Sequence, residues 1–234
     1  LREAEPAEAP PVHEPLGVYL AALAASSRDM LRHAWFRHFL RARILFLSVE
    51  FALPFFAVHA ATYHARTAPG LTMMVIAVSL GMMIGGVVWP ALGKRRSLQL
   101  VLFLGPLVSL AAAAIAAANH LDDAVPSPFL HALAIFFLSL ASQATFDGSN
   151  TYVVRSAGDA ERPYAVSMMN LAAGLGGLVL ALGAGLVADG PGTFVALILM
   201  VVLNIAAALV ARTLPDVVPA AEPAATPTAW GVAR

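Results

Sequence analysis

Six long apolar stretches are the feature of this sequence that most constrains its fold. Each is close to the ~20 residues that an α-helix needs to cross about 30 Å of hydrocarbon. We expect spanning helices at residues 44–64, 70–92, 98–118, 129–153, 164–188 and 193–211. In lipid, backbone N–H and C=O groups find no water, and a helix satisfies them within its own segment. The sequence therefore predicts an all-α membrane protein with six transmembrane helices.

The basic residues fall on one side of such a bundle. Because successive spans alternate in direction, every second connection lies on the same side, and that side holds all fourteen Lys and Arg residues except Arg66. The opposite connections carry acid instead, at Asp122, Asp123 and Asp189. Basic loops remain on the cytoplasmic side of a membrane. We therefore expect both termini in the cytoplasm.

Composition excludes several classes of protein. With 59% hydrophobic and 12% charged residues, the chain has too little polar surface for a water-soluble globule, so the lipid bilayer is its expected partner. Zero net charge argues against nucleic acid, because no basic field exists to meet phosphates. The absence of cysteine excludes disulfides and thiolate chemistry.

No enzyme motif, cofactor site or metal site is recognisable. The sequence lacks GxSxG, HExxH and a phosphate loop, so no hydrolase or kinase constellation is present. His59, His64, His120 and His131 lack the spacing of metal ligands. We interpret them as structural residues near the outer interface.

The chain divides into four segments. Residues 1–15 are rich in Pro, Ala and Glu and are expected to form a disordered linker, and Leu1 in place of Met suggests that the sequence starts inside a longer protein. Residues 16–43 alternate leucines and arginines at roughly helical spacing, which predicts an amphipathic helix on the inner leaflet. Residues 44–212 hold the spans, and residues 213–234 are an expected mobile cytoplasmic tail.

The two halves of the bundle carry a weak internal repeat. The second and fifth spans hold glycine pairs at residues 85–86 and 176–177, and the first and fourth spans each hold one acid, Glu50 and Asp147. Three helices followed by three in inverted orientation are typical of transporters. Glycine pairs are also frequent in Ala-rich membrane helices, so the alternative is that they serve packing alone.

The acid of the fourth span is the first candidate for chemistry, because a carboxylate at mid-bilayer costs about 2.5 to 3.5 kcal/mol even on a lenient scale. Asp147 shares one helical face with Ser139, Gln143 and Asn150. That face needs a water-filled pathway or protein partners. We interpret it as the wall of a polar pathway in which Asp147 binds a proton or cation. The alternative is an inner gate in which Asp147 pairs with Arg155.

Glu50 offers a similar choice. Arg43 lies seven residues earlier on the same helical face and would neutralise it, whereas a carboxylate beside a cavity would serve as a proton carrier. Pro54, four residues after Glu50, removes the donor that the Glu50 carbonyl would accept, so we expect a kink there.

Other residues of the spans predict helix packing. Small residues recur every fourth position in the fifth span, which lets another helix approach closely. They are Ala173, Gly177, Ala181 and Gly185. Asn204 is a lone polar residue of the sixth span, which favours a hydrogen bond between helices over a ligand contact.

The loop after the second span has the frame of the motif GxxxDRxGRR. Four positions match it: Gly86, Gly93, Lys94 and Arg95. Pro90 and Ala91 stand where the motif has Asp and Arg.

With this loop, three groups of residues resemble the C-terminal six-helix half of a major facilitator superfamily transporter. Residues 36–43 followed by 52–56 look like the start of the seventh helix in bacterial members. Arg162-Pro163 before the Gly-rich stretch 170–185 is similar to the eleventh helix. The resemblance covers about residues 30–216.

The resemblance implies a secondary transporter that moves a small solute by alternating access, as two six-helix halves rock around a midplane site. It implies that the first and fourth spans line the cavity, with the motif loop, Arg43 and Arg155 at an inner gate. An N-terminal six-helix half would complete the pathway in a bacterial inner membrane. The alternative is a non-transport six-helix scaffold or sensor, in which the acids only pair with Arg43 and Arg155.

Overall fold

The computed structural model describes residue 17 and residues 25–64, 68–121, 127–190 and 192–217. The predicted linker 1–15 and most of the predicted tail lie outside these ranges.

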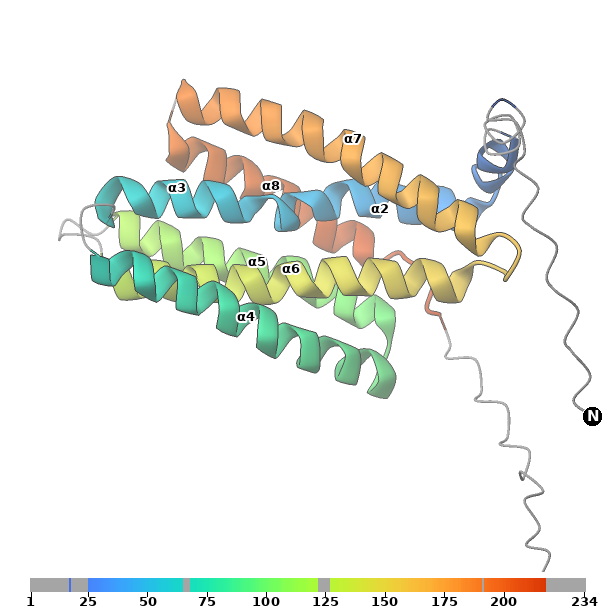
Figure 1. The fold of residues 1–234 in the computed structure, drawn as a ribbon, viewed down its shortest axis with the longest axis horizontal. Helices are drawn as coiled ribbons and strands as arrows, with labels where there is room; N and C mark the ends of the chain where they lie inside the picture. The colour runs from blue at the N-terminus through green and yellow to red at the C-terminus, as the bar shows by residue number, and fades with distance from the viewer. Residues whose placement is uncertain (1–16, 18–24, 65–67, 122–126, 191, 218–234) are drawn as a thin grey trace, which may run out of the picture.

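Six spanning helices build the described part of the chain, which contains no strand (Figure 1). The helices are α2 (Ala34–Glu50), α3 (Ala52–His64), α4 (Ala68–Arg95), α5 (Leu98–Leu121), α6 (Pro128–Ser156), α7 (Arg162–Asp189) and α8 (Thr193–Ala211). Together α2 and α3 make the first span, and each of the others is long and apolar enough to cross a membrane. The predicted all-α fold is confirmed, and every predicted span overlaps one of these six.

The first span bends where Pro54 predicts it. Helix α2 ends at Glu50, Phe51 lies between the two helices, and α3 begins at Ala52. Because Pro54 has no N–H to donate to the Glu50 carbonyl, the helical hydrogen-bond ladder is interrupted at this point.

The first span also begins earlier than predicted. Residues 25–30 are helical, a turn follows, and α2 then passes without a break through the predicted boundary at Arg43. Phe36 and Phe39 on this part of α2 are fully buried, and Phe39 stacks on Tyr152 with 5.0 Å between ring centroids. Because these aromatic rings are buried, residues 34–43 of the predicted interfacial segment pack inside the bundle.

The packing of the helices follows a three-plus-three pattern. The first span packs against α7 and α8, the fourth span α6 packs against α4 and α5, and α5 packs against α8. If the first, second and third spans are exchanged with the fourth, fifth and sixth, each of these pairs becomes a pair that is also in contact. In Figure 1, α4 and α7 accordingly lie at opposite edges of the bundle.

Helices α4 and α7 are the least buried spans. Their outer faces expose large apolar side chains, among them Val75, Val87, Val179 and Leu186. Such faces are suited to lipid or to another apolar helical surface.

The two ends of the bundle differ in charge. We call the end where Lys94, Arg155 and Arg212 lie the basic end, and the other the opposite end. At the basic end the first residues of the predicted tail pack on the bundle: Leu214 is buried, and the Tyr152 hydroxyl donates to the Pro215 carbonyl at 3.1 Å.

Candidate functional site

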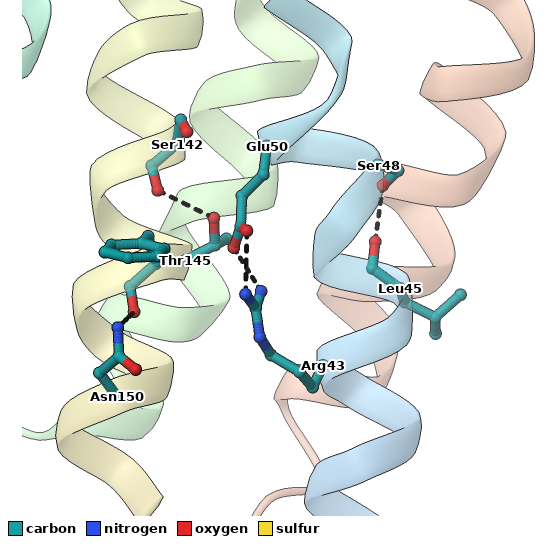
Figure 2. Close-up of polar contacts among 8 residues, drawn as sticks. Arg43, Leu45, Ser48, Glu50, Ser142, Thr145 and Asn150 are labelled. Atoms are coloured by element: carbon teal, nitrogen blue, oxygen red, sulfur yellow. Dashed lines mark hydrogen bonds and ion pairs between the residues drawn. The ribbon is translucent and has the colours of Figure 1, made fainter. Parts of the chain in front are cut away.

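Glu50 and Arg43 form a two-pronged ion pair inside the bundle. Nη1 of Arg43 donates to Oε1 of Glu50, and Nη2 donates to Oε2 at 2.9 Å. The Arg43 side chain is 4% exposed and that of Glu50 is 12% exposed. In Figure 2 the two side chains reach toward each other beside α6, against which α2 packs. The pairing that the sequence left open is therefore made, and each charge is compensated by its partner.

Asp147 lies in a small cavity at the basic end, between α4, α5 and α6. The cavity has a volume of about 150 Å³, and its lining includes Trp89, Lys94, Val101 and Arg155. Among the described residues Asp147 has neither a hydrogen bond nor an ion pair, although two basic side chains line the same cavity. The carboxylate is thus half-buried without a direct partner.

The rest of the predicted polar face packs against protein. A Cβ added at Gly81 would lie 2.8 Å from the Ser139 Cβ, and one added at Gly85 would lie 2.9 Å from the Gln143 Cβ. Ser139 is buried and donates to the Ile135 carbonyl at 2.8 Å. Ser139 and Gln143 therefore face protein rather than a water-filled pathway, because α4 covers this part of the face.

Asn150 continues this face toward the basic end. Its Nδ2 donates to the Phe146 carbonyl at 3.0 Å, within the same helix (Figure 2). Among the described residues, Asp147 and Gln143 are therefore the members of this face whose side-chain polar groups form no hydrogen bond, and Asp147 is the one that can ionise.

The residues that match the motif lie in the last part of α4, toward the basic end. A Cβ added at Gly93 would lie 3.1 Å from a methyl carbon of Leu98, so glycine allows α4 and α5 to meet here. Lys94 and Arg95 occupy the last turn of α4, where cations interact favourably with the helix dipole. Gly86 faces open space, with nothing within 4 Å of an added Cβ.

The small-residue ladder of α7 contacts the first span over a short stretch. A Cβ at Gly177 would lie 2.6 Å from the Phe51 ring, and one at Gly176 would lie 2.8 Å from a methyl carbon of Leu47. Ala173 and Ala181 are half-buried, whereas an added Cβ at Gly185 meets nothing within 4 Å. The close contact is thus centred on the glycine pair rather than on the full ladder.

One buried polar network joins three spans. The Ser48 hydroxyl donates to Oδ1 of Asn204 at 2.6 Å, and Nδ2 of Asn204 donates to the Ser109 hydroxyl at 2.7 Å. The interhelical role predicted for Asn204 is confirmed. The partners Ser48 and Ser109 have no signal in the sequence, since serines are frequent in membrane helices.

Six spanning helices around a buried ion pair and a half-buried carboxylate define a polytopic integral membrane protein. The sequence profile of the Major Facilitator Superfamily matches residues 39–233, and the chain belongs to this family. Proteins of this family are transporters rather than enzymes, so the chain is a membrane transporter of the major facilitator type. No curated protein matches the chain.

Proposed function

We propose that the chain is one half of a secondary active transporter that moves a small solute by alternating access, coupled to protons through Asp147. The observation that carries the proposal is the position of this carboxylate in a cavity without a direct partner. A half-buried carboxylate that lacks a compensating bond is costly in its charged form and readily takes up a proton. Lys94 and Arg155 in the same cavity would respond to that change of charge.

Glu50 has a different role in this proposal. Both of its carboxylate oxygens already accept hydrogen bonds from Arg43, which supports a structural role. The pair sits at the bend between α2 and α3, and we assign it to holding this bend while the span moves. In some proteins a buried ionic or polar pair fixes one arrangement of helices.

The proposal includes an orientation and a partner. Basic loops remain in the cytoplasm, so the basic end with Asp147 would face the cell interior, in a bacterial inner membrane. The exposed apolar faces of α4 and α7 support a second six-helix half that completes the pathway.

The test replaces Asp147 by Asn in the full-length protein. A thermal-shift screen of sugars, amino acids and cationic drugs first identifies a stabilising solute, and proteoliposomes with an imposed pH gradient then measure its uptake. We expect gradient-driven uptake to fall to background in the variant. Asp159→Asn is the matched control, since Asp159 is exposed and, among the described residues, forms an ion pair with Arg162 alone. Uptake at the wild-type rate in Asp147→Asn would remove this residue from the mechanism.

The fully formed Arg43–Glu50 pair favours a second assignment, in which the acids of the spans have a structural role and transport is not coupled to protons through them. In that case the acids serve structure alone, and a charge-swapped Arg43→Glu/Glu50→Arg protein would keep its full function. If the pair holds the bend while the helices move during transport, the swapped protein should show impaired uptake, because the swap changes the electrostatic field around the bend.

A further inference from the structure

Two arginines that are distant in the sequence meet in a groove at the basic end of the bundle. Arg96 lies between α4 and α5, and Arg212 directly follows the last residue of α8. The groove runs between the start of α5 and the end of α8 and has a volume of about 550 Å³. Its lining also includes Ser97, Gln99, Leu100 and Phe103. Two positive charges and an apolar surface therefore share one site.

Contacts between α5 and α8 place the Arg212 side chain. Nε2 of Gln99 donates to the Arg212 carbonyl at 2.7 Å, which joins the end of α8 to the first turn of α5. The guanidinium carbon of Arg212 lies 5.4 Å from the centroid of the Phe103 ring. A cation over an aromatic face is attracted by the charge distribution of the ring. The Arg212 guanidinium is therefore held against α5 at the groove.

Within the described ranges neither arginine is neutralised by an acid. Arg96 and Arg212 are exposed and form no ion pair with a described residue. Asp216, four residues after Arg212, is exposed and does not line the groove. The backbone adds to the positive field, because α5 begins here at Leu98 and the first turn of a helix carries partial positive charge. The groove is therefore complementary to an anion.

An exposed apolar stripe leads from the arginines along the same two helices. On α8, Leu209 and Ile205 are exposed and lie three and seven residues before Arg212. These spacings place them on the helical face of Arg212. On α5, Leu107 is exposed four residues after Phe103. An anion that carries long apolar chains would find sites for its charge and for its chains on one continuous surface.

We propose that this groove binds the phosphate headgroup of an anionic phospholipid, such as phosphatidylglycerol. The two guanidinium groups hold the phosphate, whose oxygens match their N–H geometry, and the acyl chains lie along the stripe of α5 and α8. The depth is suitable, because α8 ends at Ala211 and α5 begins at Leu98, which places the arginines at the level of the headgroups. Basic pockets between transmembrane helices are suited to such headgroups.

This lipid site goes beyond the proposed function. None of the residues that line the groove lines the Asp147 cavity. Binding of the lipid therefore requires neither transport nor proton coupling, and the two proposals can fail independently.

The test measures which lipid lies beside the groove. Residues 1–234 contain no cysteine, so a fluorophore is attached at Leu209→Cys in the full-length protein, with any cysteine in the rest of the protein replaced by serine. The protein is placed in phosphatidylcholine nanodiscs with a trace of phosphatidylglycerol or phosphatidylcholine that carries a nitroxide on its acyl chain. We expect the phosphatidylglycerol probe to quench the fluorophore more strongly. Equal quenching by the two probes overturns the proposal.

Arginine variants assign the preference to the groove. Each of Arg96→Gln and Arg212→Gln should lower the preference for phosphatidylglycerol about fivefold, and the double variant should abolish it while quenching by the phosphatidylcholine probe stays unchanged. Arg28→Gln/Arg41→Gln is the matched control, because both arginines are exposed at the basic end and neither lines the groove. A full preference in the groove double variant, or loss of the preference in the control, overturns the proposal.

Two further arms separate a lipid from a soluble phosphate and locate the site along α8. Sodium phosphate in large excess should reduce the quenching no more than sodium chloride of equal ionic strength, because a soluble anion cannot use the apolar stripe. Specific displacement by phosphate overturns the assignment to a lipid. A fluorophore at Ile198→Cys, an exposed position toward the opposite end of α8, should be quenched equally by both probes. A preference there as large as at Leu209→Cys would contradict a site at the arginines.

Discussion

At the scale of single residues, a charge inside the bilayer is tolerated where its partner matches its geometry. The guanidinium of Arg43 meets both oxygens of Glu50, because a separation of seven residues is close to two helical turns and places both on one face. Asp147 has no such match: Arg155, eight residues on, reaches the same cavity without pairing with it. Glu50 is therefore paired, whereas Asp147 has no ion-pair partner among the described residues.

The Arg43–Glu50 pair predicts an asymmetric response to mutation. Arg43→Met leaves a buried carboxylate without a partner and should lower stability by about 3 to 5 kcal/mol. The double variant Arg43→Met/Glu50→Leu removes both charges and should recover most of that loss. Unfolding in detergent measures both, with Arg41→Met at an exposed neighbouring position as control. Equal stability of Arg43→Met and wild type would contradict the prediction.

At the scale of helices, glycine determines which spans touch. Gly81 and Gly85 let α4 lie against α6, and Gly176 and Gly177 let α7 lie against the first span. These two contacts correspond under the exchange of the first three spans with the last three. Gly85 of the first glycine pair and both glycines of the second therefore lie at equivalent helix contacts, each against a span that carries an acid, while Gly86 faces open space.

Neighbouring glycines of α4 allow a controlled test. An added Cβ at Gly85 would lie 2.9 Å from the Cβ and 3.1 Å from the Cγ of Gln143, so Gly85→Ala should force the helices apart at a cost of about 1 to 3 kcal/mol. Gly86→Ala meets nothing within 4 Å and should be neutral or stabilising by up to about 1 kcal/mol through helix propensity. Thermal unfolding of both variants in one detergent decides between them. Similar shifts for the two would show that α4 does not approach α6 through Gly85.

At the scale of the whole molecule, the two ends of the bundle differ in chemistry. The basic end contains the Asp147 cavity, and the Arg43–Glu50 pair lies farther into the bundle. The opposite end holds the rings of His59, His120 and His131. An alternating-access transporter exposes its centre to one end at a time. The proton site that we propose at Asp147 would therefore be open to one side of the membrane at a time.

Orientation in the membrane follows from the same asymmetry. Gly158→Cys lies exposed between α6 and α7 at the basic end, and Leu121→Cys lies exposed where α5 ends at the opposite end. In intact cells a membrane-impermeant maleimide should label only the second, and the first should react once the membrane is permeabilised. Labelling of Gly158→Cys from outside an intact cell would reverse the proposed orientation.

The sequence by itself determined what depends on short stretches of chain. Each spanning helix satisfies its own backbone, so hydropathy alone located all six, and α8 agrees with the prediction at both ends. The bend at Pro54 and the pairing of Arg43 with Glu50 were predictable for the same reason, since both depend on geometry within one helix. The start of the first span was not, because the burial of Phe36 and Phe39 depends on α6 and α7.

Only the tertiary structure decided which helices meet and which polar groups find partners. Three features join residues from spans that are distant in the sequence. Helix α4 covers Ser139 and Gln143, Asn204 bonds to two other spans, and the ring of His59 lies near those of His120 and His131. Most of the surface of a membrane span is apolar, so hydropathy cannot say which of its apolar faces packs on protein and which faces lipid. That choice is made by close packing and interhelical hydrogen bonds, which exist only once the helices have assembled.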